Sequence, residues 1–410
     1  MTAIGRTRPH PLEAAEVPCL RCNPTMAVRP FAAGDIPAVA HLFARVYPQA
    51  RWASQADCEA YFQQMFFASP WADPRLPSWV AMEGTRAVGF IGVMPRPMRL
   101  RAQAVQAAVV TQLMVEQDGR HGVTAAQLLR KALAGPQALT VSDGANETSR
   151  KMWQALGGLT STLYSLQWRR LLRPAQSTLQ RASGPHGRAA AILATPVAVL
   201  ADVCNAYYRA LPRASGLVEE PLDAARLLEG LGDAARGVAL NPHYDHDSLD
   251  WLLAQVRAKR RHGELQARRL RLPGGAIAGW FLYYLNGGTS KVLQLHARED
   301  TARAVLDHLF NHAWRGGASA IEGRMEPRLA HALGRRHCLF HSSSVYTLIH
   351  SRDAALLGTF ARGDAFFSRL EGEWWMRFVG EPLGRAASAP APMAGVSFKV
   401  LRARQLPASP

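Results

Sequence analysis

The chain has 410 residues, which is too many for one small hydrophobic core and favours two or three domains. Hydrophobic residues make up 48% of it and charged residues 19%, as is ordinary for a soluble globular protein. No apolar run approaches the roughly 18–20 residues that span a bilayer, and residues 1–25 lack the apolar core of a signal peptide. We therefore expect a cytoplasmic protein without membrane insertion, with residues 1–25 as a disordered extension.

The net charge of +17 raises the question of nucleic-acid binding. Only five of the 48 basic residues are lysine, and the two halves of the chain carry similar positive charge. A charge spread in this way differs from the basic patch or stripe that marks a nucleic-acid-binding protein. We expect no nucleic-acid partner, and a basic surface equally suits an anionic ligand such as coenzyme A.

Two short clusters contain the residue types of a metal site. Cys19 and Cys22 have ligand spacing, but no second pair lies near them and zinc needs four ligands. The cluster from His243 to Asp247 comes immediately before a predicted helix, where capping side chains and first-turn carboxylates are the plainer explanation. We predict no metal site, and the odd number of cysteines argues against a disulfide framework.

The first part of the chain shows the pattern of a mixed sheet with helices on both faces, an α/β (α+β) fold class. An antiparallel hairpin leads into a third strand, a helix and a parallel strand. In chain order we expect strand 28–31, helices 35–46 and 54–67, strands 79–82, 87–94 and 106–115, helix 122–133, strand 139–142, helix 147–156 and strand 162–168.

A second series of similar order follows a helical connector at residues 173–240. Residues 26–172 and 241–378 are thus predicted as two domains in tandem, before a disordered tail at 379–410. The apolar segment 366–375 is expected to dock on the second domain. The second series comprises helix 246–259, strands 265–272, 277–285 and 291–296, helix 301–314, strand 320–324, helix 327–333 and strand 345–350.

Short matching segments indicate that the second series is a duplicate of the first. The sequence Ala-Val-Gly-Phe at 87–90 corresponds to Ile-Ala-Gly-Trp at 277–280, each within a hairpin strand. The Ala-Leu-Gly that ends at Gly157 corresponds to the Ala-Leu-Gly that ends at Gly334. The second series lacks a glycine between its third strand and the next helix. We therefore expect it to shape the cleft in which the first series binds a substrate, or to serve as structure.

The junction of the third strand and its helix suggests a phosphate site. Gly119 and Gly122 lie between them, and glycines let backbone amides approach a ligand closely. A helix N-terminus adds unpaired N–H donors and a positive dipole end. Such junctions are common, and a plain strand–helix connection is the plainer explanation of this one when it is taken alone.

This loop, in this order of elements, resembles the coenzyme A loop of the GNAT superfamily of N-acetyltransferases, whose pattern is Gln/Arg-x-x-Gly-x-Gly/Ala. With Gly122 on the central glycine, Gly119 and Thr124 depart from the pattern. The resemblance implies that backbone amides hold the pyrophosphate of acetyl-CoA or another acyl-CoA, and that the strand end pairs with the pantetheine arm. The residues assigned to this binding are Leu113, Met114, Val115, Gly119, Arg120, His121, Gly122, Val123 and Thr124.

A second segment resembles the same superfamily. Asn146, an aromatic residue seven positions later and the Leu-Gly at 156–157 match its late helix. The resemblance implies that Asn146 contacts the pantetheine arm. The aromatic position is often a tyrosine that protonates the leaving thiolate; here it is Trp153, which can only pack against the arm. A splayed gap is expected between the strands that end at Val115 and Ser142.

The resemblance implies an N-acyltransferase that moves an acetyl or other acyl group from a CoA thioester to an amine on a small molecule or sugar by direct attack. Such a reaction needs a base, and Glu116 and Asp143 follow the strands that should border the acceptor cleft. A solvated loop carboxylate is the plainer explanation of each of them. Two alternatives remain: a Fem-type transferase that uses aminoacyl-tRNA, and a non-catalytic protein that binds acyl-CoA or a partner.

Overall fold

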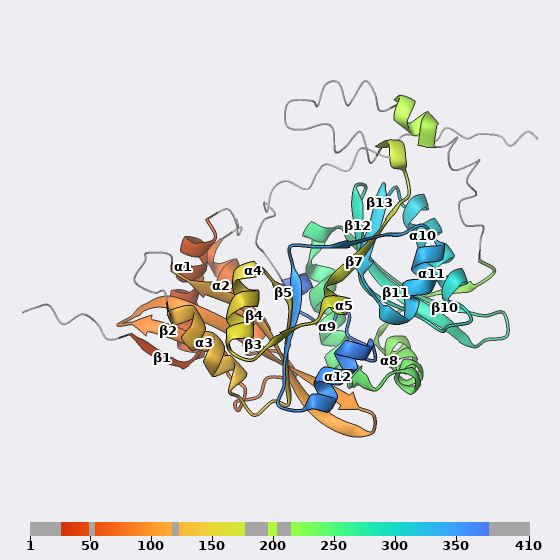
Figure 1. Cartoon of the computed structure of the whole chain (residues 1–410). Coiled ribbons are helices and arrows are strands. Elements are labelled where there is room, and N and C mark those ends of the chain that lie inside the picture. The colour runs from red at the N-terminus through yellow and green to blue at the C-terminus, as the bar shows by residue number, and fades with distance from the viewer. Residues whose placement is uncertain (1–25, 49–53, 117–122, 177–195, 203–214, 377–410) are drawn as a thin grey trace, which may run out of the picture.

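The computed structural model describes residues 26–48, 54–116, 123–176, 196–202 and 215–376. Within them the chain forms two mixed β-sheets, each with helices on its faces, that lie side by side (Figure 1). The predicted α/β class is confirmed. The extension 1–25 with its cysteine pair, the tail 379–410 and the glycine-containing loop up to Gly122 lie outside the described residues.

The first sheet has the strand order β1-β2-β3-β4-β5-β15-β6, with β9 paired to the distal part of β3. Only the β4–β5 pair is parallel among these strands, and helix α3 connects its two members. The strands are β1 (Ala27–Pro30), β2 (Trp79–Glu83), β3 (Arg86–Leu100), β4 (Gln103–Val115), β5 (Leu139–Ala145), β6 (Leu159–Thr160), β9 (Leu240–Pro242) and β15 (Tyr346–His350).

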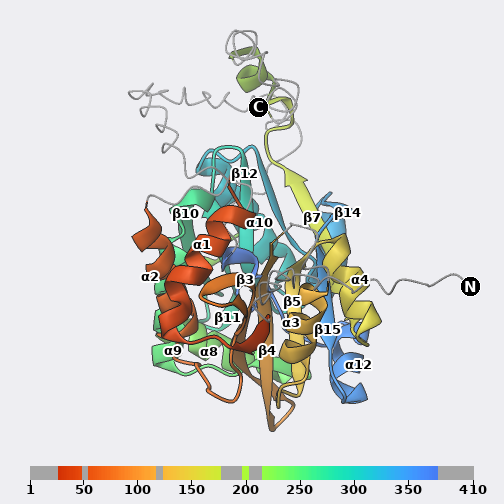
Figure 2. The ribbon, with the colours of Figure 1, turned by 90° about the vertical axis from the view of Figure 1, so that its left-hand side faces the viewer.

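Helices cover both faces of this sheet, as Figure 2 shows. On one face lie α1 (Ile36–Val46) and α2 (Gln55–Phe66), whose apolar side chains pack on Phe90 and Met94 of β3. On the other lie α3 (Thr124–Leu133) and α4 (Glu147–Ala155), packed on Val88 and Ile91 of the same strand. β3 thus supplies side chains to two separate cores, and register shifts beside Val88 and between Phe90 and Gly92 interrupt the simple alternation of its faces.

The second sheet has the order β14-β7-β13-β12-β11-β10-β8. Its β12–β13 pair is parallel and is connected by α10 (Ala302–Arg315). The strands are β7 (Leu166–Leu171), β8 (Val218–Pro221), β10 (Glu264–Arg271), β11 (Ile277–Leu285), β12 (Thr289–Ala297), β13 (Ala320–Arg324) and β14 (Leu339–Ser342).

The other helices of this half and of its connections are α5 (Thr162–Ser165), α8 (Ala224–Ala234), α9 (His246–Ala258), α11 (Ala330–Arg335) and α12 (Ala354–Arg362).

The two sheets exchange a strand. β7, which was predicted at 162–168 to close the first series, pairs with β13 and β14 of the second sheet. β15, which was predicted at 345–350 to close the second series, pairs with β5 of the first sheet. Strand β8, within the predicted helical connector, also joins the second sheet. The proposed domain boundaries and the duplication stay predictions, but neither sheet is built from one continuous stretch of chain.

The hairpin of β3 and β4 is longer than predicted. Pro95 and Pro97 interrupt the apolar pattern of β3 in the sequence, yet the strand continues to Leu100 and pairs with β4 throughout. Residues 98–100 of its distal part pair with β9, which lies in the chain between β8 and β10 of the second sheet. The hairpin therefore connects the first half of the molecule to the second.

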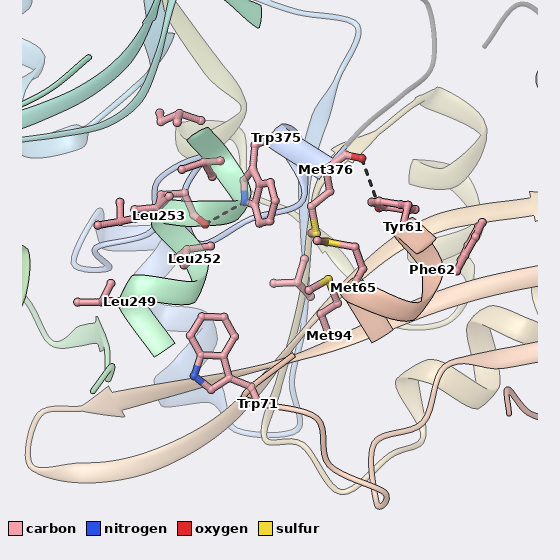
Figure 3. Packing of buried hydrophobic residues seen from close by; sticks show 14 of the residues in the cluster. Tyr61, Phe62, Met65, Trp71, Met94, Leu249, Leu252, Leu253, Trp375 and Met376 are labelled. Carbon is pink, nitrogen blue, oxygen red and sulfur yellow. Dashed lines mark hydrogen bonds between the residues drawn. The ribbon is translucent and has the colours of Figure 1, made fainter. Parts of the chain in front are cut away.

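The last described residues, 366–376, form a segment that we call the C-terminal segment. Trp375 and Met376 are completely buried between α9, which carries Leu249 and Leu252, and α2, which carries Tyr61 (Figure 3). The Tyr61 hydroxyl donates to the carbonyl of Met376 at 3.4 Å. The segment was expected to dock on the second domain; it packs against α9 there and also against the first half, so it belongs to a core that both share.

Candidate functional site

The parallel strands β4 and β5 pair over only a short stretch and then separate. Their ladder joins residues 107–109 to residues 139–141, and among the described residues it does not continue beyond Val109 and Val141. Gln112 of β4 lies in a β-bulge with a φ of 51°, a strained value that turns the backbone out of the regular ladder. The structure therefore contains the splayed gap that the sequence predicted.

The gap forms an open pocket between α1, β4, the β5–α4 junction and the C-terminal segment. Two residues that line it each carry a buried polar atom, Thr111 Oγ1 and Gln112 Oε1, that has no hydrogen-bond partner in the part of the chain that the structure describes. Buried polar groups are costly without partners. Their position indicates a ligand that brings hydrogen-bonding groups of its own.

Asn146 and Trp153 both line the gap, and the local fold explains the motif that contains them. Asn146 is the N-cap of α4, and its Oδ1 accepts the N–H of Ser149 at 2.9 Å. Helix α4 ends in a Schellman motif in which the N–H of Gly158 donates to Trp153 at 2.7 Å and Gly157 takes a φ of 84°. Capping uses the Asn146 oxygen, so its amide nitrogen is the group suited to a ligand.

Trp153 is 2% exposed and packs in the core between α3 and α4. Its ring forms one wall of the gap. The indole offers an N–H but no group that titrates like a tyrosine hydroxyl. Trp153 therefore shapes the gap, and its predicted packing against a pantetheine arm stays a prediction.

Beyond the gap, β4 continues to Val115, and α3 begins at Thr124. Val115 pairs with Gly89 and Met114 with Phe90, so β3 occupies one hydrogen-bonding edge of this part of β4. A Cβ at Gly89 would lie 2.9 Å from Leu128 of α3, so the glycine permits close packing of that helix. Leu113 lines the gap.

Of the predicted phosphate loop, the structure describes only its last residues. Thr124 begins α3 and is buried, whereas Val123 before it is 65% exposed. Gly119, Arg120, His121 and Gly122 fall outside the described residues. The predicted contact of this loop with a pyrophosphate stays a prediction.

Glu116 and Asp143, the two carboxylates considered as bases, are both engaged in ion pairs. Glu116 pairs with Arg45 at 2.7 Å and with Arg86, which ties the end of β4 to α1 and β3. Neither it nor Asp143 lines the gap. These contacts favour structural roles over the acid–base role considered for them.

Asp143 is an anchor for the C-terminal segment. Its side chain is fully buried, pairs with Arg324 and accepts the backbone N–H groups of Glu373 at 2.6 Å and Trp374 at 3.1 Å. A Cβ on Gly372 would lie 2.3 Å from the Asp143 carboxyl, so only glycine fits there. The segment is thereby fixed against the end of β5.

The anchored segment brings a different carboxylate, Glu373, into the gap. Its Oε1 accepts the Ser142 hydroxyl at 2.5 Å and the backbone N–H of Gly144 at 3.0 Å. Glu373 is 5% exposed and lines the pocket together with Gln112 and Asn146. Sequence reasoning missed this residue, because nothing in the local sequence shows that the segment enters the first half.

Other predictions about candidate sites concern metals and membranes. Asp245 caps α9 and forms a capping box with Ser248, which confirms the capping interpretation of the 243–247 cluster. Among the described residues there is no group of three or more His, Cys, Asp or Glu side chains arranged to hold a metal ion. In the same residues no helix has both the length and the apolar character required to span a membrane.

The fold matches that of known N-acetyltransferases. The chain is similar to GCN5-related N-acetyltransferases from Kribbella flavida (TM-score 0.53, 14% identity, 82% of this chain and 74% of that one) and from Anabaena variabilis ATCC 29413 (TM-score 0.53, 10% identity, 80% and 73%). It is also similar to a probable N-acyltransferase from Enterococcus faecalis V583 (TM-score 0.51, 10% identity, 83% and 74%). No protein-family model and no curated protein matches the sequence. The chain has a GNAT-like fold.

Proposed function

We propose that this protein is an N-acyltransferase that moves an acetyl or other acyl group from a CoA thioester to an amine. The observation that carries the proposal is the splayed gap between β4 and β5 with the carboxylate of Glu373 inside it. The gap suits a thin, amide-containing arm, and the carboxylate suits a proton acceptor. The GNAT-like fold supports the same class of reaction.

In this proposal the acyl-CoA enters from the outer end of the gap. The helix dipole at the start of α3 favours the negative charge of a pyrophosphate near Thr124. The pantetheine arm then runs along β4 past Leu113, where its amide groups can partner Gln112 Oε1 and the Asn146 side chain. This places the thioester near the Gln112 bulge.

Transfer then needs only orientation, a base and support for the developing oxyanion. The amine nitrogen attacks the thioester carbonyl carbon, and Glu373 takes the proton that the nitrogen loses. Collapse of the tetrahedral intermediate breaks the C–S bond, forms the amide and releases the CoA thiolate. The bulge at Gln112, whose backbone departs from the ladder, is the candidate source of an oxyanion donor.

The leaving thiolate also needs a proton, which Trp153 does not supply. Tyr47, at the end of α1, lines the same gap and carries a hydroxyl. We assign it as the candidate acid. If Tyr47 has this role, Tyr47→Phe slows turnover without weakening acyl-CoA binding.

Calorimetric titration with acetyl-CoA and longer acyl-CoAs tests the proposal, followed by turnover of an amine panel with thiol release as the readout. Binding and turnover are expected. Failure to bind any acyl-CoA would overturn the proposal in favour of the Fem-type alternative, which uses aminoacyl-tRNA. Binding without turnover of any amine would favour a non-catalytic acyl-CoA-binding protein.

A further inference from the structure

A further pocket lies in the second half of the molecule, between the chain that leads into β8 and the C-terminal half of α10. Its walls include the turn at residues 215–217, Glu219 of β8, and His308, His312 and Arg315 of α10. These residues are separate from those that line the gap between β4 and β5. We call this pocket the β8–α10 pocket.

Three side chains of the β8–α10 pocket form one continuous chain of hydrogen bonds. The Ser215 hydroxyl lies 2.9 Å from Nδ1 of His308, and Nε2 of the same ring lies 2.6 Å from Oε2 of Glu219. An ionised carboxylate can only accept, and a neutral imidazole carries a single N–H. Nε2 therefore carries the hydrogen, which leaves Nδ1 to accept that of the Ser215 hydroxyl. This is the relation of a nucleophile, a base and a group that orients the base.

The Glu219 carboxylate is held in place and kept ionised. Its Oε1 accepts Nε of Arg268, on the neighbouring strand β10, at 2.8 Å. Burial alone would raise the pKa of Glu219, but the hydrogen bond from His308, the nearby ring of His312 and Arg268 together hold that pKa below its usual value. An ionised carboxylate at this position stabilises the imidazolium that forms when His308 takes a proton.

The turn before β8 presents the serine to this base. Ser215 and His308 are half-buried and line the pocket, so a ligand inside it can contact both. Gly216 takes a φ of 66°, a left-handed value that glycine adopts freely. The N–H of Leu217 donates to Ser215 Oγ at 3.4 Å, and this contact leaves the hydroxyl hydrogen for His308.

Two other side chains of α10 complete the pocket. His312 is oriented by Tyr283, whose hydroxyl lies 2.7 Å from its Nδ1. Arg315 follows three residues later, on the same face of the helix. Within the part of the chain that the structure describes, its guanidinium has no hydrogen-bond or ion-pair partner. A cation in this position suits the negative charge that develops on a carbonyl oxygen during attack.

We propose that the β8–α10 pocket is a second catalytic site that hydrolyses small carboxylic esters, with Ser215 as nucleophile, His308 as base and Glu219 as the group that orients it. Ser215 Oγ attacks the carbonyl carbon, and its proton passes to Nδ1 of His308. Collapse of the tetrahedral intermediate breaks the ester C–O bond, and His308 returns the proton to the departing alcohol. Water then attacks the acyl-serine with the same base, which releases the carboxylic acid and restores the hydroxyl.

A fluorophosphonate probe tests the nucleophile directly. Ser215 Oγ displaces fluoride from phosphorus, and the new P–O bond persists, so mass spectrometry of peptides identifies the labelled serine. We expect one label for each full-length chain, at Ser215. Labelling of a different serine, or of none, would overturn the proposal.

Hydrolysis of p-nitrophenyl acetate, followed by the release of p-nitrophenolate, measures the complete reaction. Ser215→Ala and His308→Gln are expected to lower kcat/KM about 100-fold or more, and His308→Gln should also abolish the labelling of Ser215. Ser342→Ala, at an exposed position of β14, is the matched control and should change neither result. Thermal unfolding confirms that the variants are folded.

The outcomes keep this inference apart from the function proposed for the gap. Hydrolysis that persists at the original rate in Ser215→Ala would place the reaction elsewhere in the molecule and overturn the second site. An active acyltransferase whose Ser215 is not labelled would overturn the second site alone. Absence of acyl-CoA binding would overturn the proposed function, while labelling of Ser215 with loss of ester hydrolysis in its variants would still establish the β8–α10 pocket as catalytic.

Discussion

The carboxylate of Glu373 lies 2.5 Å from the hydroxyl of Ser142, although 231 residues separate them in the chain. Ser142 lies on β5 of the first sheet, and Glu373 arrives only after the chain has built the second sheet. The same segment is held by Asp143, the neighbour of Ser142. The gap in the first half is therefore completed by residues from the end of the second, which gives the second half a part in the site.

Replacement of the Glu373 carboxylate should remove the proposed base and leave the shape of the gap unchanged. Glu373→Gln keeps an oxygen that can accept from Ser142 and Gly144, but an amide cannot take the amine proton. We expect kcat to fall about 10²- to 10⁴-fold, the usual contribution of general base catalysis, with an unchanged dissociation constant for acetyl-CoA. Steady-state kinetics and calorimetry measure the two effects. Glu264→Gln, at an exposed strand position, is the control, and full activity of Glu373→Gln would exclude the residue as base.

Because Asp143 anchors the C-terminal segment, its replacement should lower stability and not only activity. Asp143→Ala leaves the buried Arg324 without its carboxylate partner and removes the acceptor for two backbone N–H groups. Loss of one partner of a buried pair typically costs about 3–5 kcal/mol. Chemical denaturation should show a loss of this size, and limited proteolysis should cut the C-terminal segment faster. A stable variant that is merely inactive would instead support a direct catalytic role for Asp143.

Individual elements of the fold could be predicted because their patterns are local. The periodicity at 277–285 and 320–324 predicts β11 and β13 with the bounds that the structure shows. The exchange of β7 and β15 could not be predicted, since either strand satisfies the same hydrophobic pattern in either sheet. The side chains of the candidate site divide in the same way, into those that local patterns reveal and those that depend on long-range contacts.

Asn146 and Trp153 were identified in the sequence through the resemblance of their segment to the GNAT superfamily, and in the structure a helix cap and a helix end fix their spacing. Glu373 was not, because its position depends on a long-range contact with Asp143 and on the space beside Gly372. Asp143 was noticed as a carboxylate after a strand, but only its burial and its partners show that it anchors the C-terminal segment.

The two roles of Asn146 can be separated by a pair of variants. Serine is an equally good N-cap but lacks the amide nitrogen, whereas alanine lacks both groups. Asn146→Ser should therefore keep the unfolding free energy and weaken acyl-CoA binding about tenfold, as expected for a lost hydrogen bond. Asn146→Ala should show the same weakening and a further loss of about 1 kcal/mol in stability. Calorimetry and urea denaturation measure the two effects, and unaltered acyl-CoA binding in both variants would remove Asn146 from the site.

Stability should fall in acid because of His262. Burial lowers its folded-state pKa to about 3, below the value of 6.5 for an exposed histidine, so the unfolded chain binds the proton more readily. The stabilisation from the neutral ring is complete above pH 6.5 and is lost as the pH falls toward 3. By pH 4 this loss amounts to roughly 3 kcal/mol. His262→Phe keeps an aromatic ring between Tyr284 and Trp374 but cannot titrate.

The difference in unfolding free energy between the protein and His262→Phe isolates this contribution from other titrating groups. That difference, measured by denaturant titration from pH 7 to pH 4, should shift in favour of the variant as the pH falls. His243→Phe, at an exposed position, should keep the acid sensitivity of the unaltered protein. A difference that stays constant with pH would show that His262 titrates alike in the folded and unfolded chains. In that case the ring is not desolvated by its position between Tyr284 and Trp374.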